Sequence, residues 1–515
     1  MPSPVRSSRA SDTARTARGR PTAAIVFGLI LLAAAIGWAS LGRWCLFAPD
    51  SFTYLDMART LWETGRLPPR RLVAPPGFAL LLAPLMRGGD LPLLPLRSIL
   101  LAAWAAVAVL TFLLHRRELG QVQAAAAGLL VALSPVLFTL TLTPLSEMVF
   151  LVLATLTLLL LERWREPGRI SSVAAAAGGL LAATACLTRS MGVVLLPLGA
   201  MVLLAKRDNP RRLRVQIALL FLAAAVLPVL AWAQRERSFP SQAGYPRVWT
   251  AALGHEETDA AGLTLQWQRL ARYGPLRLES LKESLLPRDL CWRAYQPPWA
   301  GITTALLGGG LAAIALWRAV RTRRPSDIFV VLTLLMVALW PWDEGPRLIA
   351  PVMTVTAAYP VWIAARIGRY GRRRGTQALA ATALVGVILL QAAGLKLLLD
   401  RLPSQREKAA ARVAEMERIA RWLTAEMPES GRWCAYLPDR HAAKLPLIGA
   451  AYLARRPLTP VDVRHPLEAL PDPEAADCVW WHESLTPRAD VLRNYRACET
   501  RDGFRVYRPI SPGSH

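Results

Sequence analysis

Residues 22–41 read TAAIVFGLILLAAAIGWASL and contain no charged side chain. A helix needs about 20 mostly apolar residues to cross the hydrocarbon core of a bilayer. The run is too long for the apolar core of a signal peptide, and the sequence ASLGRWC at its end is a poor cleavage site. We therefore expect residues 22–41 to form a retained membrane helix.

The composition of the whole chain is that of a membrane protein. Of its 515 residues, 53% are hydrophobic and 19% charged, where soluble domains carry about 25% charged residues. The mean hydropathy is +0.30. The net charge of +25 comes from arginines in short clusters between apolar runs, a placement typical of membrane topology. We therefore expect membrane lipids around the chain and no nucleic acid as a partner.

Apolar runs long enough to span a membrane recur along the chain. They predict an α-helical polytopic membrane protein with about eleven transmembrane helices. The runs lie at about residues 22–42, 92–114, 122–142, 145–161, 172–188, 191–205, 213–233, 299–317, 327–342, 347–365 and 376–398.

Charge clusters predict the orientation. If the Arg-rich tail, residues 1–21, is cytoplasmic, then alternating spans place every strong basic cluster on the cytoplasmic side, as the positive-inside rule requires. This count treats TRSMG, residues 188–192, as a break between two helices and not as a bend in one. The basic clusters are HRR (115–117), ERWREPGR (162–169), KRDNPRRLR (206–214), RAVRTRR (318–324) and RIGRYGRRR (366–374).

This topology divides the chain into three parts: the cytoplasmic tail, a transmembrane domain at residues 22–398, and an extracytoplasmic domain at residues 399–515. The membrane would be the plasma (inner) membrane. The last part alternates a charged helical pattern with short apolar pieces such as GRWCAYL and DCVWWH, which predicts a small soluble α/β domain. Its three cysteines, Cys434, Cys478 and Cys498, permit a disulfide outside the cytoplasm, and the sequence does not choose the pair.

Two outer loops, residues 43–91 and 234–298, separate transmembrane helices. The first contains LFAPDSFTYLDMARTLW, with Asp50 and Asp56, and then APPGFALLLAPLM. Both pieces have apolar side chains near helical spacing and suit helices that lie flat in the membrane interface. The second loop is rich in aromatic residues, as expected at headgroup level.

Four motifs in order resemble the GT-C superfamily of integral-membrane glycosyltransferases, in particular its protein mannosyltransferase and aminoarabinose-lipid A transferase group. They are PDSFTYL after the first span, a Pro-Pro-Gly segment about 25 residues later, LSPVLFTLTLTPLSEMVFLVLATL, and GPRLIAPVM before a late span. The resemblance covers roughly residues 20–400. The terminal domain matches only in position.

The resemblance implies transfer of a sugar from a polyprenyl-phosphate donor to an acceptor, which is a protein, lipid or glycan, by inverting displacement at the extracytoplasmic face. Asp50 corresponds to the acidic residue of the first outer loop and would be the general base. Glu147 corresponds to the acidic residue of the second loop and would bind acceptor or sugar. Arg347 corresponds to the basic residue that holds the lipid-linked phosphate, with Arg189 as a second phosphate-binding candidate.

The sequence departs from the family pattern in two places. Ser51 follows Asp50 where many members have a second acid, and the lysine that precedes Pro-Pro in many members is missing. These departures leave the subfamily, the acceptor and a metal role open. No cofactor is expected, and none of the six cysteines lies in a zinc-binding spacing.

Simpler explanations exist for several of these residues. Asp50 could cap the helix that follows it, and Asp56 could face water on an amphipathic helix. Arg347 could be an interfacial arginine whose head reaches the headgroups. The lone histidines His255 and His482 are better explained as surface residues than as site residues.

Other function classes share this composition. A polytopic transporter or flippase usually shows internal repeats, which this sequence lacks. A non-catalytic scaffold of envelope glycan assembly is a third possibility. An oligosaccharide ligase would share the topology with a different outer loop. The transferase is therefore the favoured hypothesis.

Overall fold

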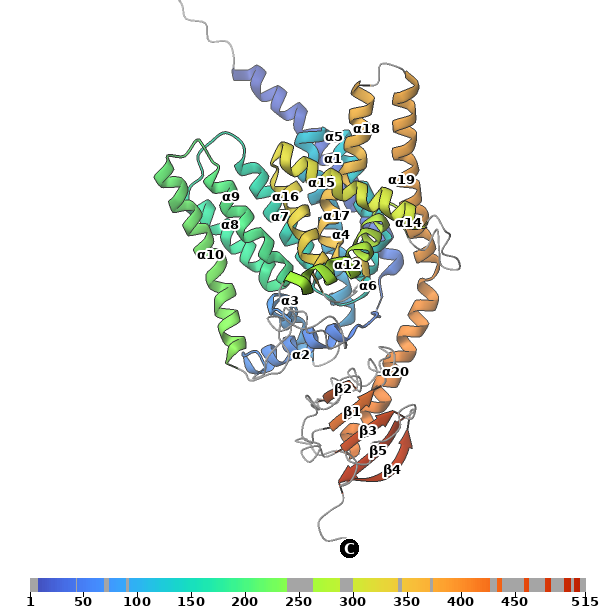
Figure 1. Ribbon diagram of the computed structural model, residues 1–515. Helices are drawn as coiled ribbons and strands as arrows, with labels where there is room; N and C mark the ends of the chain where they lie inside the picture. The colour runs from blue at the N-terminus through green and yellow to red at the C-terminus, as the bar shows by residue number, and fades with distance from the viewer. Residues whose placement is uncertain are drawn as a thin grey trace, which may run out of the picture.

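The computed structural model is mostly helical (Figure 1). It describes residues 8–42, 44–68, 74–88, 92–238, 263–287, 300–340, 345–370 and 374–426, and five strands between residues 433 and 509.

Every predicted apolar run overlaps a helix or a series of consecutive helices. Three runs each cover a series of consecutive helices: η2 and α9; α14, η3 and α15; and η4, α17 and α18. The bounds are α1 (Ser8–Ser40), α4 (Leu93–Leu119), α5 (Gln121–Ala132), α6 (Pro135–Leu142), α7 (Glu147–Trp164), α8 (Ser172–Thr188), η2 (Ser190–Val194), α9 (Leu195–Leu204), α10 (Arg211–Arg237), α14 (Ala300–Thr303), the π-helical η3 (Thr304–Gly309), α15 (Gly310–Thr322), α16 (Pro325–Ala338), η4 (Gly345–Leu348), α17 (Ala350–Thr356), α18 (Ala358–Tyr370) and α19 (Arg374–Asp400).

Five helices in the described ranges are long and apolar enough to cross a membrane, and six if α5 and α6 form one broken span. These two helices meet at 46°. The break falls at Pro135, which has no N–H to continue the helical bonding of α5. The chain is therefore a multi-pass membrane protein, while the count of eleven spans stays a prediction.

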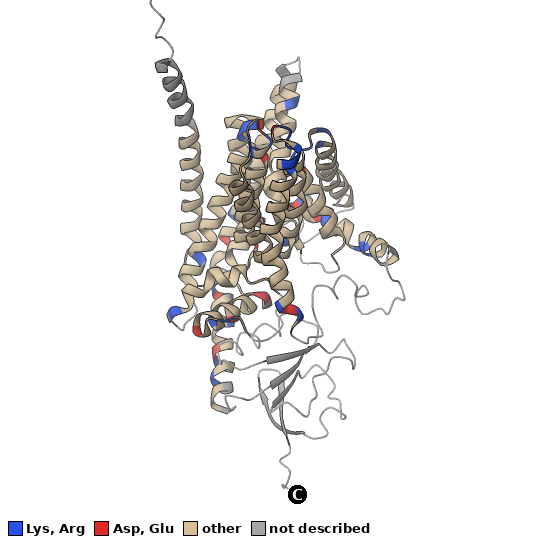
Figure 2. Cartoon of the chain, turned by 90° about the vertical axis from the view of Figure 1, so that its left-hand side faces the viewer, with Lys and Arg blue, Asp and Glu red and all other residues tan. Residues whose placement is uncertain are grey.

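The predicted basic clusters gather at one end of the bundle. Asp208 accepts a hydrogen bond of 2.8 Å from the Gly168 N–H, which, together with Lys206, lowers the pKa of Asp208. Further contacts join four of the clusters: Arg117 to Glu166, Lys206 to the Glu166 carbonyl, and Arg324 to Glu162. Arg366 of the fifth cluster lies over the ring of Trp317, the residue before RAVRTRR. Figure 2 shows charged residues mainly toward the two ends of the bundle, with fewer between them.

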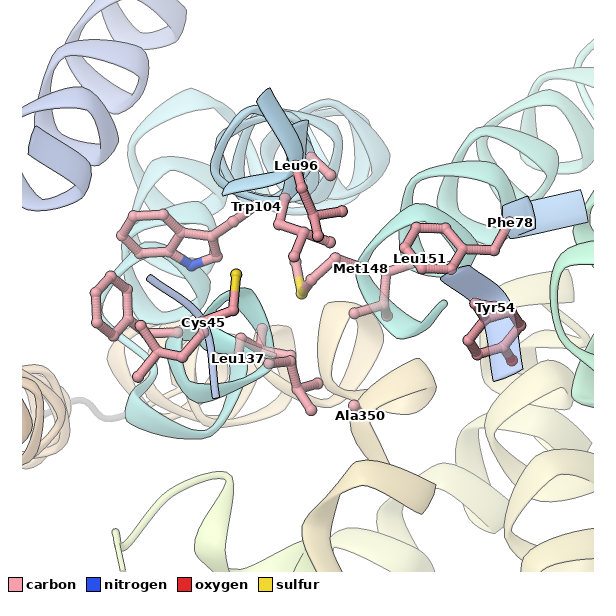
Figure 3. Packing of buried hydrophobic residues seen from close by; sticks show 14 of the residues in the cluster. Cys45, Tyr54, Phe78, Leu96, Trp104, Leu137, Met148, Leu151 and Ala350 are labelled. Carbon is pink, nitrogen blue, oxygen red and sulfur yellow. The ribbon is translucent and has the colours of Figure 1, made fainter. Parts of the chain in front are cut away.

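The first outer loop forms α2 (Pro49–Thr64), α3 (Gly77–Leu82) and η1 (Ala83–Gly88) at the opposite end (Figure 1). The apolar faces of these pieces pack largely against protein, and their position flat in the membrane interface stays a prediction. Tyr54 of α2 and Phe78 of α3 pack edge to face, with ring centroids 5.1 Å apart. Figure 3 shows both rings close to Met148 and Leu151 of α7. Burial of this kind fixes α2 on the bundle.

The second outer loop is described in part. Its helix α12 (Leu263–Glu283) packs on η3, η4 and α16. Tyr273 is buried and Trp267 is exposed, while the rest of the predicted aromatic belt, with His255, lies outside the described residues.

After α19, the helix α20 (Leu402–Glu426) leads away from the bundle (Figure 1). Five strands follow: β1 (Trp433–Leu437), β2 (Leu458–Asp462), β3 (Cys478–His482), β4 (Tyr495–Arg501) and β5 (Phe504–Pro509). Their order is β2-β1-β3-β5-β4, with β1 parallel to β2 and β3, and β5 antiparallel to β3 and β4. The segments between these strands lie outside the described residues, so the α/β prediction, the domain boundaries and the disulfide remain predictions.

Candidate active site

The four predicted site residues come together at the end of the bundle opposite the basic clusters. Asp50 lies in the first turn of α2, Glu147 begins α7, Arg189 separates α8 from η2, and Arg347 lies in η4. Arg347 Nη2 donates to Asp50 Oδ2 at 3.0 Å, and its Nε lies 3.8 Å from Glu147 Oε1. Arg189 Nη1 lies 2.6 Å from the same Glu147 oxygen. Carboxylates and guanidinium groups therefore alternate along one chain of ion pairs.

Exposure is lowest at Glu147 and highest at Asp50. The side chain of Glu147 is 2% exposed and that of Arg189 is 13% exposed, whereas Arg347 reaches 24% and Asp50 reaches 53%. A buried carboxylate is tolerated when it is paired, and Glu147 has two arginine neighbours. Asp50 is the carboxylate that a ligand from outside can reach first.

The start of α2 presents Asp50. The Leu46 N–H donates to the Leu142 carbonyl at 2.8 Å, which ties the segment before α2 to the end of α6. The helix begins at Pro49, with Ala48 as its N-cap, and the Ala48 N–H donates to Ser51 Oγ. Asp50 is therefore not the N-cap, and the capping explanation does not account for it. Its charge is favoured in the first turn by the helix dipole.

The start of α7 holds Glu147. Tyr54 and Ser146 share a hydrogen bond of 2.9 Å between their hydroxyls, which links α2 to the residue before Glu147. A negative charge at a helix N-terminus is stabilised by the free N–H groups there. Glu147 Oε2 is buried and finds no hydrogen-bond donor within the described part of the chain. This oxygen therefore has an unused capacity to accept a hydrogen bond.

A tight turn presents Arg189, and two glycines make it possible. A Cβ on Gly77 would lie 2.7 Å from Thr188 Oγ1 and 2.8 Å from the Leu187 carbonyl oxygen. A Cβ on Gly192 would lie 2.6 Å from the backbone nitrogen of Cys186. The Pro-Pro-Gly segment thus has a packing role, because only glycine lets α3 approach the turn so closely.

Sequence reasoning missed three contributors: Tyr54, Ser146 and Gly192. Each lies inside or beside a motif already singled out, PDSFTYL, TPLSEMVF or TRSMG, so adjacency to a candidate residue was the available signal. Asp56 is six residues beyond Asp50, which corresponds to about 240° around a helix, so it points to another side of α2. His482 is in β3.

No group of three or more His, Cys, Asp and Glu side chains suited to a metal ion occurs in the described ranges. The two carboxylates of the site each lie beside an arginine. A divalent cation would be repelled by these guanidinium groups, so we derive no step through a metal.

Comparison with known proteins supports the family resemblance. Residues 73–232 match the family model of dolichyl-phosphate-mannose-protein mannosyltransferase. The matched segment includes Gly77, Glu147 and Arg189, while Asp50 and Arg347 lie outside it. A search of curated proteins found no match.

Solved structures share the fold. The crystal structure of ArnT from Cupriavidus metallidurans bound to undecaprenyl phosphate matches with a TM-score of 0.55 and 16% identity, over 95% of this chain and 98% of that chain. Its apo form matches with a TM-score of 0.55 and 15% identity, over 94% and 98%. The apo oligosaccharyltransferase of Archaeoglobus fulgidus matches with a TM-score of 0.50 and 12% identity, over 85% of this chain and 64% of that one.

These findings define the class: the chain is a multi-pass membrane protein with the fold of the GT-C glycosyltransferases. Within that class it resembles the mannosyltransferase model in sequence and ArnT in structure. The resemblance inferred from the sequence motifs is confirmed.

Proposed function

We propose that the protein is an inverting glycosyltransferase that moves a sugar from a polyprenyl-phosphate donor to an acceptor at the extracytoplasmic face. The observation that carries the proposal is the meeting of two carboxylates and two arginines from four separate segments at one end of the bundle. The fold adds support, since the structurally similar ArnT was crystallised with undecaprenyl phosphate.

Arg347 is the proposed ligand of the donor phosphate. Its guanidinium already binds the carboxylate of Asp50, and a phosphate oxygen offers the same hydrogen-bond acceptor with more charge. Donor binding would therefore replace Asp50 on Arg347. This exchange leaves the Asp50 carboxylate free to accept a proton.

The reaction then follows from the positions of these groups. An acceptor heteroatom attacks the anomeric carbon of the sugar, the bond from that carbon to the phosphate oxygen breaks, and the configuration inverts. Asp50 takes the proton lost by the attacking atom. Arg347, with Arg189 behind Glu147, stabilises the negative charge that builds on the leaving phosphate.

Glu147 has a separate proposed role. Its buried Oε2 lacks a donor among the residues described, and a buried acceptor without a donor is costly. A hydroxyl of the sugar or a polar hydrogen of the acceptor would satisfy it. We therefore assign Glu147 to orientation of a substrate.

The direction of the chain in the membrane is part of the proposal. The basic clusters would face the cytoplasm of a cell with an inner membrane, together with the N-terminus, and the site would face outward with the strands that follow α20. The positive-inside rule supports this direction, because it depends on the arginine and lysine content of the loops.

The proposal is tested by comparing Asp50→Asn with Asp56→Asn. Lipid analysis of a deletion strain first identifies the accumulated polyprenyl-phosphate sugar, which then serves as the donor. Asp50→Asn retains the size of the side chain and removes the base, so turnover falls by about 10²- to 10⁴-fold. Asp56→Asn is the matched control and retains near-normal turnover.

Normal turnover of Asp50→Asn, on membranes with equal amounts of protein, would refute the role of Asp50 as base. Absence of any accumulated polyprenyl-phosphate sugar in the deletion strain would refute the proposed donor.

A further inference from the structure

A second polar site lies at the end of the bundle opposite the candidate active site. A cavity of about 320 Å³ opens there between the ends of α4 and α7, which is at the lower end of the size range of small-molecule sites. We call it the arginine cavity. It is lined by Leu113, Leu114, Arg116, Arg117, Glu118, Leu159, Glu162, Arg163, Arg165, Glu166 and Arg324.

The three carboxylates of the arginine cavity are already paired. Glu166 pairs with Arg117. Glu162 lies 3.2 Å from Arg324, and it also accepts a hydrogen bond of 2.6 Å from the Ser326 hydroxyl. Glu118 lies against Arg324 and against Arg318, which is just outside the cavity. These carboxylates therefore serve protein arginines and are not open to bind a cation.

Two arginines of the lining remain. Arg116 and Arg163 have no carboxylate partner among the residues that the structure describes. With the carboxylates neutralised by their partners, these two guanidinium groups give the cavity a net positive charge. Guanidinium groups bind phosphate through paired hydrogen bonds, so a phosphate is the ligand that such a lining suits.

The rest of the lining indicates where the phosphate comes from. Leu113, Leu114 and Leu159 make one wall apolar, and the helices α4 and α7 that supply them run through the apolar bundle. A soluble phosphate gains nothing from contact with an apolar wall, whereas the glycerol and first acyl carbons of a lipid can pack against it. Arg117 is 52% exposed, so the cavity is open to its surroundings.

We propose that the arginine cavity binds the phosphate headgroup of one anionic glycerophospholipid. The site is distinct from the candidate active site, since Glu147 and Glu162 on the same helix are about 22 Å apart at 1.5 Å per residue. The lipid would therefore come from the leaflet opposite to the donor substrate.

The test counts bound lipids by native mass spectrometry of the full-length protein in detergent. Phosphatidylglycerol is titrated, with phosphatidylcholine as the comparison that has no net charge. We expect the wild-type protein to bind one phosphatidylglycerol molecule in preference to phosphatidylcholine. The double variant Arg116→Ala with Arg163→Ala should bind phosphatidylglycerol about thirtyfold more weakly, which is the effect of two arginines near an anionic lipid. If the double variant does not fold, the single variants Arg116→Gln and Arg163→Gln replace it, and each should weaken phosphatidylglycerol binding about fivefold.

The matched control removes two arginines elsewhere on the same end. Arg211 and Arg212 are exposed in the first turn of α10 and do not line the cavity, so their double Ala variant should keep the phosphatidylglycerol affinity. Equal losses in both double variants would refute a built site. Equal binding of the two lipids would refute the role of charge, and displacement of the lipid by equimolar inorganic phosphate would refute a lipid ligand.

Discussion

Replacement of Gly77 by Ala tests whether the turn before Arg189 positions the catalytic groups. The added methyl carbon would lie 2.7 Å from Thr188 Oγ1 and 2.8 Å from two backbone atoms of Leu187 and Thr188. Ordinary van der Waals contact begins at 3.4 Å. Because two of the three neighbours are backbone atoms, either α3 or the turn has to move by about 0.6 Å, and overpacking of this kind costs about 1–3 kcal/mol.

That displacement reaches the candidate active site through the next residue. Arg189 Nη1 lies 2.6 Å from Glu147, so a shift of the turn lengthens this contact and moves the carboxylate that orients a substrate. A misplacement of 1 Å costs about 10²-fold in rate, and we therefore expect turnover to fall by about ten- to thirtyfold at saturating donor.

The assay measures initial transfer rates on membranes with equal amounts of protein, together with thermal denaturation in detergent. Gly386→Ala in α19 is the matched control, since its added carbon meets nothing within 4 Å. This control should keep full turnover. Gly192→Ala, whose added carbon would meet the backbone of Ala185 and Cys186 near the end of α8, should reproduce the loss. Normal turnover in both turn variants would refute the positioning role.

Three further predictions concern other parts of the molecule. Arg347→Ala should raise the donor KM strongly and Arg347→Lys should recover only part, because a point charge does not reproduce a paired guanidinium contact; equal KM values for wild type and Ala would indicate a role at the headgroups only. A reporter fused after residue 400 should be active outside the cytoplasm and one fused near Arg372 inside it, and the reverse pattern would overturn the proposed orientation. Asp327→Ala, which breaks a buried ion pair, should destabilise the protein by about 3–5 kcal/mol in thermal denaturation, whereas Asp400→Ala at an exposed pair should cost under about 1 kcal/mol.

The apolar runs predicted the helices well because a membrane helix is a local property of about 20 residues. The predicted break at TRSMG is visible as the turn between α8 and α9. The candidate residues were found through family motifs, yet their pairing was not predictable. Arg347 and Asp50 are 297 residues apart in the chain, and no local pattern encodes a contact at that separation.

From the sequence alone, the basic clusters indicate only the topology. In the structure, Asp327 is fully buried and binds Arg318 at 3.0 Å and the hydroxyl of Tyr359 at 3.1 Å. A single carboxylate among many arginines does not reveal, from the sequence alone, that it is buried or which arginine it binds. Their partners come from different helices, so the fold had to be known before the polar network beneath the loops became visible.

The helix α20 sets the distance between the helical bundle and the strands that follow it. Its first turns are held at the bundle, where Arg406 lies over the ring of Trp44 at 5.6 Å, and its 25 residues span about 37 Å. Its length fixes both the distance and the direction of the strands, because each residue added to its middle would advance the following chain by about 1.5 Å and turn it by about 100°. Homologues with seven extra residues there would carry their strands about 10 Å further out and on nearly the same side, whereas two extra residues would swing them to the opposite side.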